Sequence, residues 1–183
     1  MRLFNTLTVA ALIGTVGFGI AGAQAADLIT VPVSSSPVEV PVADTGFDWN
    51  GFYAGVYGVT QFSPAGGTQF GLGLDLGVNA RIEFVLIGAE VAVHGLGGGA
   101  GMSTYVQGLG RAGVAATDDV ILYAAGGLGV DVGPAGGTDA LIGGGVELGV
   151  TDDVTLRGQY LHGFALTGAN PKDQVSIGAN FHF

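Results

Sequence analysis

Six charged side chains within otherwise apolar segments are the residues of this 183-residue sequence with the clearest capacity for chemistry. They are Asp75, Glu90, Arg111, Asp131, Glu147 and Arg157. Four acids and two bases gathered in one enclosed space can pair with one another or with trapped water, because an unpaired buried charge is costly. The alternative is a charged constriction that selects permeating ions. Which of these holds depends on the elements that carry the six residues.

Catalytic and metal-binding patterns are not evident elsewhere in the sequence. The three histidines, His94, His162 and His182, have no partner at the spacing of metal ligands, and the chain contains no cysteine. His94 is expected inside the fold, near Glu90. The sequence has no serine nucleophile elbow and no phosphate-binding loop. Ser103 and His94 could flank one loop, but a lipid-modifying enzyme needs a complete Ser, His and Asp group there. We predict no enzymatic activity, no metal and no cofactor.

The segments that carry the charged residues alternate apolar and polar positions with a period of two, which is typical of β-strands. Every even position from Phe70 to Val78 is apolar, and the odd positions around them are polar or Gly. The last nine residues, 175–183, repeat this pattern. Eight strands are predicted, at 50–60, 68–79, 84–94, 102–115, 120–132, 140–150, 154–162 and 174–183. Most have roughly the 9–11 residues that a tilted strand needs to cross a bilayer.

The composition indicates which face of these strands points inward. Only 11% of the residues are charged, 48% are hydrophobic, and 36 are Gly. A soluble barrel would place the mid-strand charges outside, whereas a membrane barrel places them in its lumen and its apolar face in lipid. So few charges suit a surface that faces lipid. We predict an all-β, eight-stranded antiparallel up-and-down transmembrane β-barrel. The formal charge of −10 argues against nucleic-acid binding.

The glycines bear on whether such a barrel is open. Eight strands enclose a narrow space, and inward glycines relieve crowding there. A barrel of this size is usually closed by its own side chains, which favours structural ion pairs over a selective constriction. So many small inward residues could also leave a thin path for water.

Two near-identical turns set the predicted register. Residues 116–120 read ATDDV and residues 150–154 read VTDDV, so both are predicted to be tight turns at one end of the barrel, with a third near 79–83. A turn centred on Asp152 puts Glu147 directly opposite Arg157. We therefore predict an ion pair between these two side chains, with Arg111 close to Glu90.

The remaining connections are rich in Gly, Pro and Asn and are expected at the opposite end of the barrel. They lie at 61–67, 95–101, 133–139 and 163–173. Because they are short, they limit any adhesive surface. Aromatic residues fall toward both ends, as expected for interfacial girdles. Trp49, Phe52, Phe181 and Phe183 are expected at the end with the tight turns, and Phe62, Tyr160 and Phe164 at the other.

The N-terminal 48 residues differ from the strands. Residues 1–25 combine an early positive charge, an apolar run and an Ala-Gln-Ala ending, which are the features of an export signal cleaved before Ala26. Residues 26–48 contain three prolines, which favour extended chain. We interpret 26–48 as a flexible periplasmic leader outside the core and 49–183 as the barrel.

Four motifs occur in order along the predicted barrel. Residues 48–55 read DWNGFYAG, 122–128 read LYAAGGL, 143–161 contain GGGVEL, TDD and LRGQYL, and the chain ends in NFHF. In this order they resemble the motifs of small OmpA-like, porin-family outer-membrane β-barrel proteins of alphaproteobacteria. Gln159 stands where that family often has Glu, and the loops are shorter than is common in it.

The resemblance implies an eight-stranded barrel in the cell outer membrane, with both termini in the periplasm. It also implies that Phe181 and Phe183 belong to the signal that the barrel assembly machinery reads on the C-terminal strand. We expect a monomer with a structural role in the envelope, whose partners are outer-membrane lipid and that machinery. There are two alternatives to this structural role. One is a narrow passive pore for ions or small solutes, and the other is an exported soluble barrel that binds a small ligand.

Overall fold

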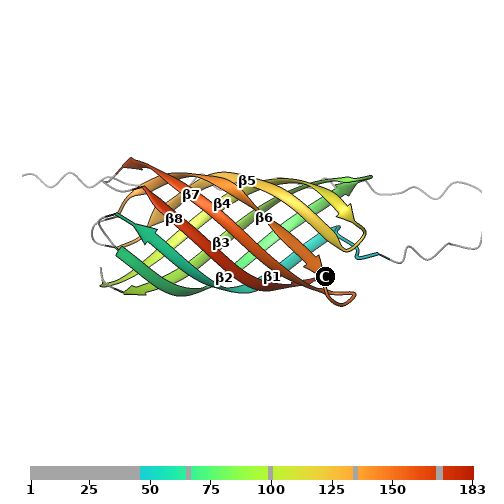
Figure 1. Ribbon diagram of the computed structural model, residues 1–183, viewed down its shortest axis with the longest axis horizontal. Helices are drawn as coiled ribbons and strands as arrows, with labels where there is room; N and C mark the ends of the chain where they lie inside the picture. Colours follow the sequence, from blue (N-terminus) through green and yellow to red (C-terminus); the bar gives the residue numbers. More distant parts are fainter. Residues whose placement is uncertain (1–45, 65–66, 99–100, 134–135, 168–170) are drawn as a thin grey trace, which may run out of the picture. The chain divides into compact units, whose positions relative to one another are not determined.

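The computed structural model describes residues 46–64, 67–98, 101–133, 136–167 and 171–183. These residues form a closed barrel in which each strand pairs antiparallel with the next and β8 pairs with β1 (Figure 1). The strands are β1 Gly51–Ser63, β2 Gly67–Ile82, β3 Val85–Gly98, β4 Gly101–Thr117, β5 Val120–Asp131, β6 Thr138–Gly149, β7 Val154–Thr167 and β8 Lys172–His182. No helix in the described ranges is long and apolar enough to cross a membrane. The predicted export signal, 1–25, and leader residues 26–45 lie outside these ranges.

All eight predicted strands are present, and several are longer than the sequence indicated. Strand β7 continues to Thr167 and β1 to Ser63, so residues assigned to loops belong to the barrel wall. The third tight turn is at Glu83 and Phe84 rather than near 79–83, because residues up to Ile82 continue β2. Glu83 adopts the left-handed conformation that a two-residue hairpin turn requires, with φ of 57°.

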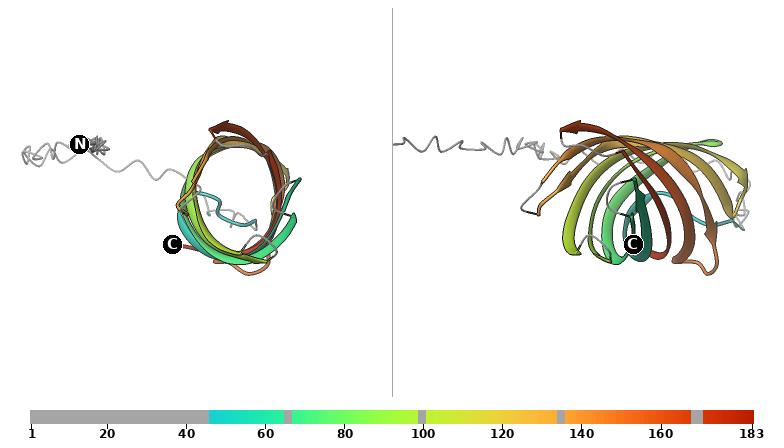
Figure 2. Two further views of the ribbon diagram at one scale, coloured as in Figure 1. Left: turned by 90° about the vertical axis from the view of Figure 1, so that its left-hand side faces the viewer. Right: turned by 60° about the vertical axis from the view of Figure 1, so that its left-hand side comes forward.

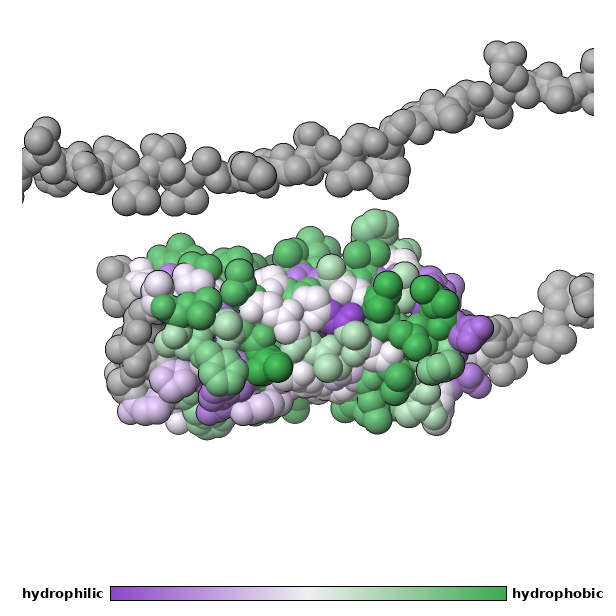
Figure 3. Space-filling model, turned by 90° about the horizontal axis from the view of Figure 1, so that it is seen from above, coloured by the Kyte–Doolittle hydropathy of each residue, from purple (hydrophilic) through white to green (hydrophobic). Residues whose placement is uncertain are grey.

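The apolar face of the sheet points outward. Leu72 is 80% exposed, whereas Glu147 is fully buried. Figure 3 shows hydrophobic side chains spread over one face of the barrel. This arrangement is the one expected for a barrel surrounded by lipid, and it is the reverse of the soluble barrel considered as an alternative.

Tyrosines pack against glycines inside the barrel. A Cβ atom on Gly73 would come within 2.7 Å of the Tyr57 hydroxyl, and one on Gly145 within 2.6 Å of the Tyr123 hydroxyl. Two further pairs of the same kind are Tyr53 with Gly77 and Tyr105 with Gly129. The inward glycines therefore make room for large side chains, an arrangement by which aromatic rings cover strand glycines.

Residues 46–50, called here the stopper, lie inside the ring of strands at the end with the tight turns (Figure 2). Trp49 is fully buried and donates from Nε1 to the Asp118 carbonyl oxygen at 3.0 Å. Phe47 is also buried, and its backbone N–H donates to Asp119 Oδ1 at 3.2 Å. Beside them, the N–H of Asn50 donates to Asp48, and this hydrogen bond lowers the pKa of Asp48. The prediction that Trp49 belongs to a lipid-facing girdle is therefore wrong, and Phe47 packs in the barrel although it was assigned to the leader.

The other predicted girdle residues do face outward. Phe183 lies next to the rings of Phe52 and Phe181, with centroids 6.5 and 6.4 Å away, at the turn end. Phe62, Tyr160 and Phe164 are exposed toward the loop end. Indoles prefer an interface, but Trp49 instead finds a buried acceptor on the turn between β4 and β5, which explains its different place.

Candidate functional site

Two arginines and three acids form one buried ion-pair cluster in the middle of the lumen. Arg157 Nη2 lies 2.6 Å from Asp75 Oδ2, and Arg157 Nη1 contacts Glu90 Oε2. Arg111 lies 3.4 Å from the same Glu90 oxygen and, through Nη2, 2.5 Å from Glu147 Oε2. The five residues come from β2, β3, β4, β6 and β7, so the cluster connects strands that are not neighbours.

The predicted partnership of Glu147 with Arg157 is correct in register but wrong as an ion pair. The two residues are direct cross-strand partners between β6 and β7. However, Arg157 reaches Asp75 and Glu90, and Glu147 pairs with Arg111. The physical reason is that a direct Glu147–Arg157 pair would leave two other buried acids without Arg157, at a large cost in free energy. The expected proximity of Arg111 and Glu90 is present.

Neutral side chains complete the cluster. Tyr53 donates to Glu90 Oε2 at 2.7 Å, and Glu147 Oε1 accepts from Thr155 at 2.6 Å and from Asn180 at 2.8 Å. The Arg111 guanidinium also lies 4.1 Å from the centroid of the Tyr123 ring. These partners occupy inward positions of their strands, as the charged residues do. The period of two in the sequence could therefore have predicted that they lie in the lumen. Charge-assisted hydrogen bonds in a low-dielectric interior are strong, which makes the cluster rigid.

Asp131 is not part of the cluster. It lies half-buried at the loop end of β5, where its Oδ1 accepts from the Gly133 N–H at 2.9 Å. A second ion pair that the sequence analysis missed lies toward this end, between Asp139 and Lys172 at 2.8 Å. Tyr105 donates to the same Asp139 carboxylate at 2.6 Å. Both residues of this ion pair had been assigned to loops, although they continue the inward alternation of β6 and β8.

Glutamines form a further buried layer in the lumen. Gln174 donates to Gln61 at 3.0 Å, and Gln61 donates to Gln69 at 3.3 Å. All three side chains are buried. The lumen therefore contains the stopper, the ion-pair cluster and this glutamine layer along its length.

The histidines are bound to neighbouring side chains. His94 is buried as expected, and its Nδ1 lies 2.9 Å from the Tyr57 hydroxyl. His162 and Tyr160 both hydrogen-bond Asp173, at 2.7 and 2.6 Å, on the outer surface toward the loop end. In the part of the chain that the structure describes, no group of three His, Cys, Asp or Glu side chains is arranged to hold a metal ion.

Comparison with solved structures identifies small outer-membrane barrels. Neisserial surface protein A matches with a TM-score of 0.53 and 14% sequence identity, over 72% of this chain and 97% of that one. Ail, the attachment invasion locus protein of Yersinia pestis, matches with a TM-score of 0.55 and 13% identity, over 72% and 96%. Its complex with the heparin analogue sucrose octasulfate gives a TM-score of 0.55 and 12% identity, over 73% and 99%.

At these identities the likeness concerns the fold. The chain is a closed eight-stranded antiparallel barrel of the kind found in bacterial outer membranes. No protein-family model and no curated protein matches the sequence. The resemblance to alphaproteobacterial porin-family proteins stays a prediction.

Proposed function

We propose that this protein is a monomeric, integral outer-membrane barrel with a structural role in the envelope, without enzymatic activity and without an ion-conducting pathway. The apolar outer surface and the likeness to outer-membrane barrels support the location. The observation that carries the structural role is the buried ion-pair cluster, because it joins non-adjacent strands across the lumen.

Conduction through this lumen would require the cluster to open. Moving Arg157 aside would leave Asp75 without its guanidinium and Glu90 with the longer contact to Arg111 at 3.4 Å, and removing one partner of a buried pair costs about 3–5 kcal/mol. The stopper and the glutamine layer would still remain in the path. The structure therefore favours a closed barrel over the narrow pore that the sequence left as an alternative.

A role in binding polyanions at the loop end is not favoured by the charges. Ail was solved with a sulfated heparin analogue, and such a ligand requires accessible basic groups. The five basic residues of this chain are Arg2, Arg81, Arg111, Arg157 and Lys172. Of those that the structure describes, Lys172 is the one toward the loop end, and it is 9% exposed and paired with Asp139.

The C-terminal strand supports a proposed interaction with the barrel assembly machinery. Phe183 closes the barrel by backbone hydrogen bonds with Phe52, at 2.9 Å from its N–H and 3.3 Å to its carbonyl oxygen. The side chains of Phe181 and Phe183 remain exposed on the outer face. Aromatic residues at a free strand end are available to a machine that pairs with that strand before closure.

Conductance in planar lipid bilayers tests the proposed function. The purified, folded protein should give no steady openings, because the buried ion pairs hold the lumen closed. Reproducible openings of one size would reject the closed-barrel proposal in favour of the pore. Cell fractionation together with heat-modifiable gel mobility tests the location, and recovery in the soluble fraction would contradict it.

A further inference from the structure

Five buried side-chain oxygen atoms of the described residues have no hydrogen-bond donor. Two of them are Asp75 Oδ1 on β2 and Asn180 Oδ1 on β8. Their residues are only 3% and 2% exposed, so bulk water does not solvate them. A buried acceptor without a donor is unfavourable, and more so when it belongs to a carboxylate.

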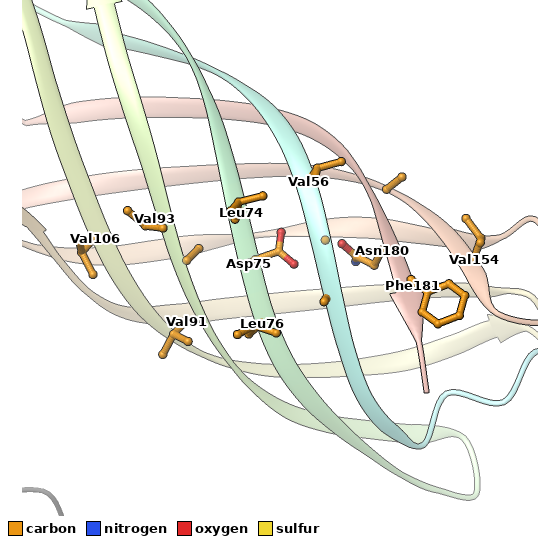
Figure 4. A pocket seen from close by; sticks show the side chains of 14 residues that line it. Val56, Leu74, Asp75, Leu76, Val91, Val93, Val106, Val154, Asn180 and Phe181 are labelled. Carbon is orange, nitrogen blue, oxygen red and sulfur yellow. The ribbon is translucent and has the colours of Figure 1, made fainter.

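The two oxygens converge in front of Gly55. This glycine, on β1, is the cross-strand partner of Asp75 on one side and of Asn180 on the other. A Cβ atom on Gly55 would lie 2.6 Å from Asp75 Oδ1 and closer still to Asn180 Oδ1. Figure 4 shows the two polar side chains pointing toward one another across β1. On the outer side of the same strands, exposed apolar side chains that include Leu74 and Phe181 line a depression of about 780 Å³.

The orientation of both side chains is fixed by their other atoms. Asp75 Oδ2 is held by Arg157 at 2.6 Å, and Asn180 Nδ2 donates to Glu147 Oε1 at 2.8 Å. Turning the amide of Asn180 would give up its bond to Glu147 and set an oxygen against that carboxylate. The two acceptors are therefore held toward the same space.

The charge of the cluster indicates what suits this space. Three carboxylates face two guanidiniums, which leaves one negative charge when the nearby His182 imidazole is neutral. Glu90 Oε1 in the same cluster is also without a donor. Water would supply hydrogen bonds but no charge, whereas a monovalent cation supplies the missing charge. Carboxylate and amide oxygens are hard ligands that suit hard cations, and the single excess negative charge suits a monovalent one.

We propose that Asp75 Oδ1 and Asn180 Oδ1, over Gly55, bind a monovalent cation such as sodium. The cation would connect β2, β1 and β8. These strands include the seam at which the first and last strands close the barrel. Sodium would thereby stabilise closure in addition to the backbone ladder.

The test measures urea unfolding of the folded, full chain in sodium chloride and in N-methylglucamine chloride. Both solutions have the same ionic strength and a pH at which imidazole is neutral. The urea concentration at the midpoint of unfolding should be higher in sodium chloride. In Asp75→Asn, the sodium concentration needed for half of the effect should rise by at least about tenfold, because affinity depends on ligand charge. Asp139→Asn is the matched control. It removes a buried carboxylate that pairs with Lys172, outside the proposed sodium site, and should keep the sodium effect.

A crystal structure with thallium(I) in place of sodium locates the ion. The expected result is an anomalous peak in contact with both oxygens. Equal midpoints in the two salts, a sodium effect retained in Asp75→Asn, or a water molecule with no thallium peak would each overturn the proposal. None of these outcomes bears on the closed-barrel function, which is tested by conductance.

Discussion

Replacing Arg157 by methionine tests whether the ion-pair cluster stabilises the barrel. Methionine keeps much of the side-chain length but removes the guanidinium that Asp75 and Glu90 share. The remaining charges are three carboxylates and Arg111, so the cluster changes from one excess negative charge to two.

The expected loss is large because the groups left behind are buried. Breaking a buried ion pair by removing one partner costs about 3–5 kcal/mol, compared with about 0–1 kcal/mol for an exposed pair. In Arg157→Met, two buried carboxylates lose the same partner. The expected loss of stability therefore lies toward the upper end of the range for a buried ion pair. Adding Asp75→Asn restores the original excess of one negative charge, so the double variant should recover a substantial part of the loss.

Equilibrium unfolding in urea, read from the gel mobility of folded and unfolded chains in lipid vesicles, measures both effects. Arg81→Met is the matched control, because Arg81 lies near the turn between β2 and β3 and its side chain donates to the Glu83 carbonyl oxygen. It should cost no more than about 1 kcal/mol. A loss of that small size in Arg157→Met, or a double variant no more stable than the single one, would refute the reasoning.

Three further changes test other parts of the barrel. Trp49→Ala should destabilise the barrel by about 3–5 kcal/mol in the same urea assay, because a fully buried aromatic ring is removed. It should nevertheless stay silent in planar bilayers, and openings would show that the stopper is the main seal. Deletion of Phe183 removes the backbone bonds to Phe52 and should lower the folded, heat-modifiable fraction in membranes; normal assembly would argue against a role for this terminus. Gly77→Ala should cost about 1–3 kcal/mol because its Cβ would meet the Tyr53 ring, whereas Gly97→Ala, with no atom within 4 Å of its Cβ, should leave the urea midpoint unchanged.

The direction of each side chain could be predicted from the sequence because a strand has a period of two. Glu147 and Arg157 were placed in the lumen and in register by counting from a turn, and both positions hold in the structure. Strand ends were less certain, since Gly, Pro and Asn near the loop end resemble turns. Asp139 and Lys172 were therefore missed, although each continues the inward alternation of its strand.

The contacts across the lumen could not be predicted in the same way. Periodicity and register describe neighbouring strands, whereas Arg157 on β7 meets Asp75 on β2 and Glu90 on β3. Which arginine reaches which acid depends on strand tilt and on the room left by other side chains. The stopper was missed for a related reason: Phe47 precedes the first strand, and no periodic pattern indicates that it turns back into the barrel.

The high glycine content suggests an open lumen, but in the structure the glycines help to fill it. Inward glycines could leave a water path, but tyrosine rings cover four of them in this barrel, namely Gly73, Gly77, Gly129 and Gly145. Tyr53 occupies the space over Gly77, and its hydroxyl donates to Glu90 and accepts from Arg111 at 2.6 Å. A β-carbon on Gly77 would displace this ring and, with it, one partner of each charged group. The glycines and the charges therefore act together: the glycines leave room for tyrosine rings, and the Tyr53 ring in turn holds a hydroxyl between Glu90 and Arg111.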